Sequence, residues 1–300
     1  MRALIALGGN ALLRRGEPAE VRAQQDNVAK ASRALAAVAS EHEVVLTHGN
    51  GPQVGLLALQ SESYEPVAPY PLDVLGAESE GMVGYMLELA LRNELPERDL
   101  VTILSAVVVS AEDPAFKAPS KPIGPLYEAE QAKQLALERG WSIGPDGEGF
   151  RRLVPSPEPQ AIVELRSLRT LIDAGVLVIC AGGGGIPVTF NGNGAMLGVE
   201  AVVDKDLTAS LLARRLEADV LVMLTDVGAV HLDWGGAEER PLGRVTPAEL
   251  RRHSFAAGSM APKVEAACRF AEATGRRAAI GGLDDAVEVV RGEAGTQVSP

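Results

Sequence analysis

The 300-residue sequence lacks the features that mark several common protein classes. Its only two cysteines, Cys180 and Cys268, lie far apart and without metal-site spacing, so we expect free thiols. No apolar run approaches the roughly 18 residues that a membrane-spanning helix needs. Residues 1–7 are too short for a signal peptide, because Gly8 and Gly9 interrupt them at once. These absences predict a soluble, cytoplasmic protein without a membrane partner.

Positive charge is also scarce, with 28 Lys and Arg residues against 40 Asp and Glu residues and a net charge of -12. A nucleic-acid partner is therefore not expected, since such proteins present a basic surface. Only six of the basic residues are lysine, so each becomes a candidate for a site that needs a compact, mobile ammonium group. The six are Lys30, Lys117, Lys121, Lys133, Lys205 and Lys263.

Several catalytic and nucleotide-binding motifs are missing as well. There is no Gly-Lys dipeptide, which excludes a P-loop. A Rossmann GxGxxG motif starting at Gly182 or Gly183 fails, because its third glycine position holds Pro187 or Val188. The four histidines show no metal-ligand spacing and no activated serine or cysteine partner, so neither a protein-held metal nor a catalytic triad is predicted.

What the sequence does contain is an alternation of strand and helix patterns. Such alternation predicts a mostly parallel sheet covered by helices on both faces, with ligands at the carboxyl ends of the strands. The expected strands are residues 2–7, 44–47, 100–104, 107–109, 176–181 and 220–224, with a last strand near the end of the chain. The expected helices are residues 20–39, 54–63, 76–93 and 206–216.

One stretch departs from this alternation. Residues 110–160 hold eight of the nineteen prolines and a Gly-Pro-Asp-Gly turn at residues 144–147. A connection of this length in a compact domain is usually functional, so we expect an inserted subdomain, about residues 111–159, that projects over the site as a lid. A short helix is expected near residues 128–138. A decorative or dimer-contacting excursion is the alternative.

Three glycine clusters follow three of the expected strands. They are Gly8-Gly9-Asn10, Gly49-Asn50-Gly51-Pro52 and the run at residues 182–185. Glycine lets backbone N–H groups surround an anion, and a following helix N-terminus adds favourable dipole charge. Together the clusters predict a phosphate or carboxylate site, although a single one could serve turn geometry alone.

Three of the lysines stand where such an anion could meet them. Lys205 and Lys263 are expected at helix starts, and Lys121 is on the inserted subdomain. Phosphoryl transfer requires aligned reactants and positive charge on the transferring group, which these lysines could supply. Asp206 could orient the lysines or cap its helix. Surface salt bridges are the alternative for each lysine.

A second ligand could sit at the end of the strand at residues 220–224. Thr225-Asp226-Val227 follows that strand, at the sheet edge where open α/β proteins hold ligands, so these residues could position a nucleotide. A plain turn is the alternative.

Taken in order, these residues resemble the carbamate kinase family within the amino acid kinase superfamily. The resemblance extends from residue 1 to about residue 298, and the THGNGPQ run is far more specific than a generic glycine loop. The motifs that carry it are ALGGNAL at 6–12, THGNGPQVG at 47–55, KPIGP at 121–125, CAGGGGIPV at 180–188, VDKD at 203–206 and GSMAPKV at 258–264.

The resemblance implies an α/β fold, a three-layer αβα sandwich around an open, mostly parallel eight-stranded sheet with a protruding lid subdomain, and a homodimer. It implies reversible phosphoryl transfer between ATP and carbamate, giving ADP and carbamoyl phosphate, with Mg²⁺ accompanying the nucleotide. Residues 1–175 would bind carbamate or carbamoyl phosphate and residues 176–300 the nucleotide, on one continuous sheet. Arginine or carbamoyl phosphate metabolism is the expected setting.

By motif match the resemblance also assigns site residues. Lys205 and Lys263 would neutralise the transferring phosphoryl group, Asp206 would hold them, and Lys121 would reach down from the lid. The substrate-binding residues would be Gly8, Gly9, Asn10, Gly49, Asn50 and Gly51. The nucleotide-binding residues would be Thr225, Asp226, Val227, Val230, Met260 and Lys263.

Some residues depart from the family pattern, and other functions compete with it. Gly228, His231 and Asp233-Trp234 stand where the family commonly has Asp, Tyr and Asn-Phe, so the contacts to adenine could differ. An acetylglutamate kinase or a uridylate kinase would keep the fold but needs a pocket for a larger acceptor. A nucleotide sensor would have no need of both Lys205 and Lys263, and an NAD-dependent enzyme lacks its glycine motif.

Overall fold

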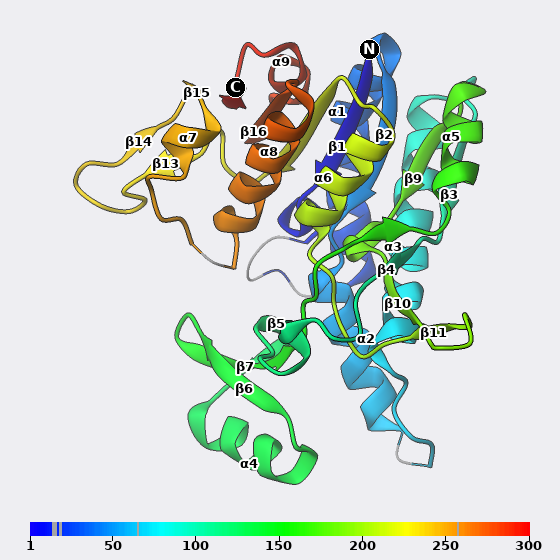
Figure 1. The fold of residues 1–300 in the computed structure, drawn as a ribbon, viewed down its shortest axis with the longest axis vertical. Helices are drawn as coiled ribbons and strands as arrows, with labels where there is room; N and C mark the ends of the chain where they lie inside the picture. The colour runs from blue at the N-terminus through cyan, green and yellow to red at the C-terminus, as the bar shows by residue number, and fades with distance from the viewer. Residues whose placement is uncertain (14–16, 18–19, 65, 257) are drawn as a thin grey trace.

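In the computed structural model, which describes residues 1–13, 17, 20–64, 66–256 and 258–300, an eight-stranded sheet forms the centre of the protein (Figure 1). The strand order is β15-β17-β16-β12-β1-β2-β9-β3, and every neighbouring pair is parallel except β16 and β17. The strands are β1 (Arg2–Leu7), β2 (Glu43–His48), β3 (Leu100–Ile103), β9 (Leu177–Cys180), β12 (Val220–Thr225), β15 (Arg244–Val245), β16 (Arg277–Gly282) and β17 (Thr296–Val298).

Helices cover both faces of this sheet. One face packs against α1 (Val21–Glu41), α3 (Leu72–Glu94) and α9 (Ala286–Arg291), the other against α5 (Leu165–Asp173), α6 (Lys205–Arg215) and α8 (Met260–Thr274). Along β1, Ala3, Ile5 and Leu7 join the first of these cores, while Leu4 and Ala6 join the second. A strand covered on both sides reads as a continuous apolar run, as β1 does. The predicted three-layer α/β sandwich is confirmed.

A second, four-stranded sheet lies beside the main one. Its order is β11-β10-β4-β8, with β4 (Ala106–Val108), β8 (Ala161–Ile162), β10 (Ile186–Phe190) and β11 (Met196–Gly198). The run expected as a strand at 107–109 belongs to this sheet, because the chain turns at Ser105 after β3 and that residue accepts a bond from the backbone of Ile186 at 2.8 Å. A short apolar run does not reveal which sheet it joins.

Helix α3 and strand β16 also differ from the sequence-based expectations. Helix α3 begins at Leu72, four residues before the expected start, because Leu72 and Leu75 are buried in a small apolar cluster with Ile123 and Val154. Strand β16 was not expected, since its sequence, RAAIGG, is rich in alanine and glycine, which have low β propensity. Pairing with β12 and burial between the helices determine its conformation instead.

The predicted protruding subdomain is confirmed, and it stands away from the main sheet at the lower left of Figure 1. Its antiparallel sheet has the order β5-β7-β6, and one helix covers it where residues 128–138 were expected to be helical. These elements are β5 (Lys121–Tyr127), α4 (Ala129–Arg139), β6 (Ser142–Asp146) and β7 (Gly149–Val154). Strand β5 rests on α2 (Gly51–Ser63) and so ties the subdomain to the main body.

The remaining elements lie on the opposite flank of the molecule from β11. The hairpin β13 (His231–Leu232) and β14 (Arg240–Pro241) and the short helix α7 (Pro247–Leu250) are close to β15 (Figure 1). Among the described helices, none combines the length and apolar character that crossing a bilayer requires.

A pair of glycine substitutions tests how the subdomain is seated. A Cβ on Gly55 of α2 would lie 2.8 Å from the Cα of Gly124 in β5, whereas a Cβ on Gly76 of α3 would meet open space. We expect Gly55→Ala to lower the melting temperature and to increase proteolysis within residues 111–159. Gly76→Ala should match or exceed the wild type, because alanine is favoured in helices by about 0.5–1 kcal/mol. Similar behaviour of the two variants would contradict this seating.

Candidate functional site

A cavity of about 550 Å³ opens at the carboxyl ends of β1, β2 and β12, between the main sheet, the subdomain and the β13 segment. Its position agrees with the rule that open α/β sheets hold ligands at this edge. It brings together all the sequence-predicted site residues except Asn10 and Val230. Those that line it are Gly8, Gly9, Gly49, Asn50, Gly51, Lys121, Lys205, Asp206, Thr225, Asp226, Val227, Met260 and Lys263.

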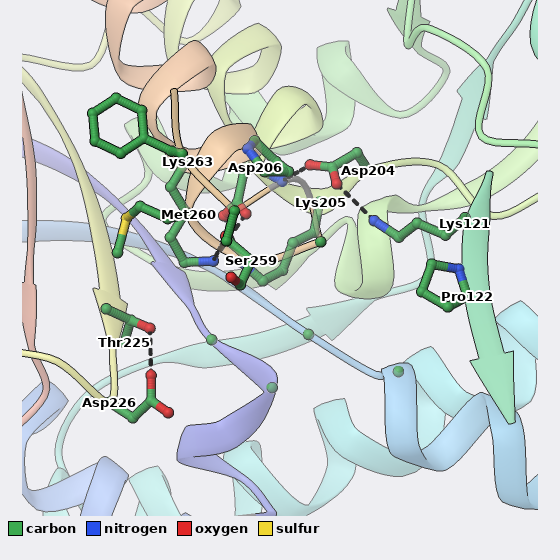
Figure 2. A pocket seen from close by; sticks show the side chains of 18 of the residues that line it. Lys121, Pro122, Asp204, Lys205, Asp206, Thr225, Asp226, Ser259, Met260 and Lys263 are labelled. Carbon is green, nitrogen blue, oxygen red and sulfur yellow. Dashed lines mark hydrogen bonds and ion pairs between the residues drawn. The ribbon is translucent and has the colours of Figure 1, made fainter. Parts of the chain in front are cut away.

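The strongest charge arrangement in the cavity is a carboxylate between two ammonium groups (Figure 2). One oxygen of Asp206 lies 2.5 Å from the Nζ of Lys205, and the other lies 3.1 Å from the Nζ of Lys263. Lys205 and Asp206 begin α6, and Lys263 is in the first turn of α8, so two packed helices bring the three side chains together. All three side chains are at least 88% buried from solvent.

Burial and charge act in opposite directions on these groups. Burial disfavours an ionised Asp206, but Lys205 and Lys263 outweigh it and hold the pKa of the carboxyl below its usual value. Burial lowers the pKa of Lys205, and so does nearby Lys263, while Asp206 counteracts both. The cluster carries one negative and two positive charges and therefore has a net positive charge available to an anion.

Lys121 reaches the same helix from the subdomain. Its Nζ lies 2.6 Å from an oxygen of Asp204, and the other oxygen of Asp204 accepts the backbone N–H bonds of Asp206 and Leu207. Asp204 is thus the N-cap of α6 and also the anchor of Lys121 (Figure 2). Asp204 is not among the site residues expected from the sequence, although an aspartate directly before a helical pattern is a capping signal.

The glycine loops at Gly8-Gly9-Asn10 and Gly49-Asn50-Gly51 pack against each other beside Lys205. The backbone of Gly49 donates to the carbonyl of Leu7 at 2.9 Å, and a Cβ on Gly49 would lie 2.8 Å from the nitrogen of Gly9. Such an approach is open only to glycine. The same Cβ position is 3.4 Å from the Cε of Lys205, so the loops lie directly beside the lysine cluster.

The third glycine loop, residues 182–185, reaches the cavity wall at Gly183. Gly183 adopts a left-handed φ of 67°, and a Cβ there would collide with the side chain of Asn50. Asn50 is itself fixed, because its Nδ2 donates to the Oγ of Ser79 at 2.8 Å. Side chains also bind the loop backbone, with Thr47 donating to the carbonyl of Ala181 at 2.8 Å.

The opposite end of the cavity is less charged. Thr225, the last residue of β12, donates to Asp226 at 3.0 Å, and Met260 lies across from them (Figure 2). His231 and Trp234 line this end as well, with their rings 5.0 Å apart edge to face. A flat apolar group such as a nucleobase suits such a wall. Trp234 appeared in the sequence analysis only as a departure from the family pattern.

Two expected residues are not placed at the cavity wall. Val230 lies fully buried in the core against α6 and α8, and its backbone N–H donates to Thr296 at 2.9 Å. The side chain of Asn10 is outside the described part of the structure, although its backbone belongs to the 3₁₀ turn Gly9–Ala11. Among the described residues, no group of three or more His, Cys, Asp or Glu side chains is arranged to hold a metal ion.

Comparisons with known proteins give the same picture over the full length of the chain. The amino acid kinase family model matches residues 1–282. A carbamate kinase of Rhizobium meliloti is 53% identical over 302 residues, which cover 100% of this chain and 93% of that protein.

Two solved structures of the carbamate kinase of Giardia lamblia are similar as well. The form bound to citric acid has a TM-score of 0.93, and the form bound to AMP-PNP has a TM-score of 0.90. Each is 41% identical, and each alignment covers 99% of this chain and 98% of the other. The chain belongs to the amino acid kinase family and, within it, to the carbamate kinases.

Proposed function

We propose that this protein catalyses reversible phosphoryl transfer between ATP and carbamate, giving ADP and carbamoyl phosphate. The observation that carries the proposal is the Lys205–Asp206–Lys263 cluster, with its net positive charge, between the glycine loops and the nucleobase-sized end of the cavity. A site for two anionic reactants needs this charge, because the reactants repel each other until it offsets them.

Phosphoryl transfer between ATP and carbamate requires little covalent chemistry from the protein. Carbamate is already an anionic oxygen nucleophile, so no general base has to remove a proton. Its oxygen forms a bond to the γ-phosphorus as the bond from that phosphorus to the β–γ bridging oxygen breaks, and the electron pair leaves with ADP. Backbone amides of Gly9 and Gly51 hold the carbamate end, and Lys205 and Lys263 offset the charge on the transferring group.

The first half of the chain, residues 1–175, supplies the acceptor side, and residues 176–300 supply the nucleotide side. Lys121 brings a third positive charge from the subdomain at 111–159, and Asp204 fixes it over the start of α6. Thr225, Asp226 and Met260 form the wall for the nucleotide. That a similar carbamate kinase is bound to AMP-PNP supports nucleotide binding in general.

Mg²⁺ enters this site with the nucleotide. Asp204 and Asp206 are already engaged by lysines, and Mg²⁺ commonly keeps several waters and binds substrate phosphates with few protein ligands. The donor set therefore fits an ion held mainly by phosphate oxygens and water. Bound there, Mg²⁺ would reduce the negative charge of the phosphates.

The protein acts as a cytoplasmic homodimer in arginine or carbamoyl phosphate metabolism. Buried free thiols at Cys180 and Cys268 fit a reducing compartment. An apolar surface runs along α3 and the β10–β11 hairpin, which pack against each other. Its exposed members are Tyr85, Leu89, Leu104, Phe190, Met196 and Leu197. Contiguous apolar surface of this kind marks an interface, and a two-fold axis would bury it against itself.

Removal of one ammonium group tests the phosphoryl-transfer proposal. We expect Lys205→Ala to lower ATP formation from ADP, Mg²⁺ and carbamoyl phosphate at least about a hundredfold, because charge stabilisation in the transition state is lost. Lys133→Ala is the matched control, since Lys133 is exposed on α4 and its ion pair among the described residues is with Glu130. Near-normal turnover by folded Lys205→Ala would contradict the role of Lys205 in stabilising the transition state. A wild-type protein that phosphorylates only acceptors larger than carbamate would contradict the proposed substrate.

The homodimer is tested by charge placed on the apolar surface. The wild type should show twice the 31.4 kDa chain mass by light scattering, and Tyr85→Arg with Leu89→Arg should show the chain mass itself. Leu137→Arg on α4 is the control, because Leu137 is 87% exposed but lies outside this surface. A monomeric wild type, or a dimer unaffected by the double substitution, would contradict the assignment.

A further inference from the structure

Behind the third glycine loop lies a buried polar cluster that the proposed chemistry does not use. Glu80 of α3 is 1% exposed, and His48 at the end of β2 is fully buried. A Cβ on Gly182 would collide with the His48 ring and would lie 3.0 Å from the Cγ of Glu80. Both side chains therefore pack side by side against the same atom of the loop.

Glu80 holds the loop through its backbone. One carboxyl oxygen accepts the N–H of Gly182 at 2.9 Å, and the other accepts the N–H of Ser105 at 3.4 Å. The next residue, Gly183, lines the cavity. The carboxyl of Glu80 thus lies one residue behind the cavity wall, on the side of the carbamate-binding loops.

The surroundings of Glu80 favour its neutral form. Burial raises the pKa of Glu80 to about 8, since the amides of Gly182 and Ser105 offset the lost solvation only in part and Glu164 adds repulsion. Burial also lowers the pKa of His48 to about 4 and raises the pKa of the Cys180 thiol, so neither neighbour is charged at neutral pH. No lysine or arginine in the described residues forms an ion pair with Glu80.

His48 supplies no positive charge that would stabilise an ionised Glu80. Its Nδ1 lies 3.1 Å from the carbonyl of Gly49, which makes Nδ1 the donor of the neutral ring. Its Nε2 is then a buried acceptor, and it has no hydrogen-bond partner in the structure. Because Nε2 has no partner, the carboxyl oxygens of Glu80 do not bind the ring, and their partners among the described residues are the backbone N–H groups of Gly182 and Ser105.

We propose that Glu80 is a positioning residue that works as a neutral acid, orienting the glycine loop without placing a negative charge beneath the carbamate-binding end of the site. The inference deepens the proposed function and rests on it. An ionised Glu80 would keep its contacts with the backbone amides. It would repel the anionic substrate across the buried glycine loop at Gly182 and Gly183, where charge interactions are poorly screened. Substrate affinity would then fall as the carboxyl loses its proton.

The first test is the pH dependence of the KM for carbamoyl phosphate, measured with ADP and Mg²⁺ from about pH 6 to about pH 9.5. In the wild type we expect this KM to rise as pH passes about 8, approaching about tenfold, while the KM for ADP stays level. Glu80→Gln keeps a neutral side chain of the same shape, so its KM should not rise. Glu164→Gln is the matched control and should keep the rise in KM, moved to a slightly lower pH, because it leaves Glu80 ionisable and removes only the repulsion from Glu164, whose own carboxyl binds the backbone of Ala106.

The second test measures thermal stability against pH and does not require catalytic activity. Unfolded Glu80 ionises near its ordinary value of 4.5 and folded Glu80 near 8, so its protonated form stabilises the wild type below pH 4.5 and this stabilisation is lost towards pH 8. The melting temperature of Glu80→Gln relative to wild type should therefore increase across that window. Absence of any wild-type turnover would contradict the proposed function but leave this readout intact.

Three results would overturn the inference. One is an active wild type whose KM for carbamoyl phosphate stays level through pH 9.5, which requires no variant to fold. Another is a Glu80→Gln profile that rises as the wild type does. The third is a melting-temperature difference between Glu80→Gln and wild type that is constant from about pH 4.5 to about pH 8.

Discussion

The site depends on one carboxylate that holds two ammonium groups together in a buried position. Without Asp206, Lys205 and Lys263 would repel each other at the junction of α6 and α8, where little water can screen them. With it, the cluster keeps one net positive charge fixed in place before any substrate arrives. Electrostatic catalysis requires this pre-organisation, because the protein then does not have to reorient its charges during phosphoryl transfer.

The rest of the fold brings the glycine loops at the ends of the strands close to this cluster. Parallel strands β1, β2 and β9 end at the same edge of the sheet, so their glycine loops meet beneath Lys205. The subdomain adds Lys121, and Asp204 couples it to α6 by capping the helix and binding the lysine at once. A protein with a net charge of -12 thus brings the ammonium groups of Lys121, Lys205 and Lys263 to one cavity, where we propose that the anionic reactants bind.

Much of the fold and of the lysine cluster could be predicted from the sequence, because lysine is scarce in it and strand and helix patterns alternate along it. Lysine is rare in this chain, so Lys205 and Lys263 beside glycine loops were recognisable, and the strand–helix alternation gave the layers of the sandwich. Other features depend on tertiary contacts that no local pattern encodes. The conformation of β16 comes from pairing with β12, Val230 is directed into the core, and Glu80 reaches Gly182 from a helix more than a hundred residues earlier.

The most direct test of the central claim replaces Asp206 by asparagine and compares stabilisation by ATP and Mg²⁺ with turnover. If Asp206 holds the two ammonium groups, folded Asp206→Asn should have a lower melting temperature without ligand, gain more from bound ATP than the wild type does, and turn over at least about a hundredfold more slowly. The nucleotide's phosphates would take over part of the missing negative charge. An equal gain from ATP with wild-type turnover would contradict the account.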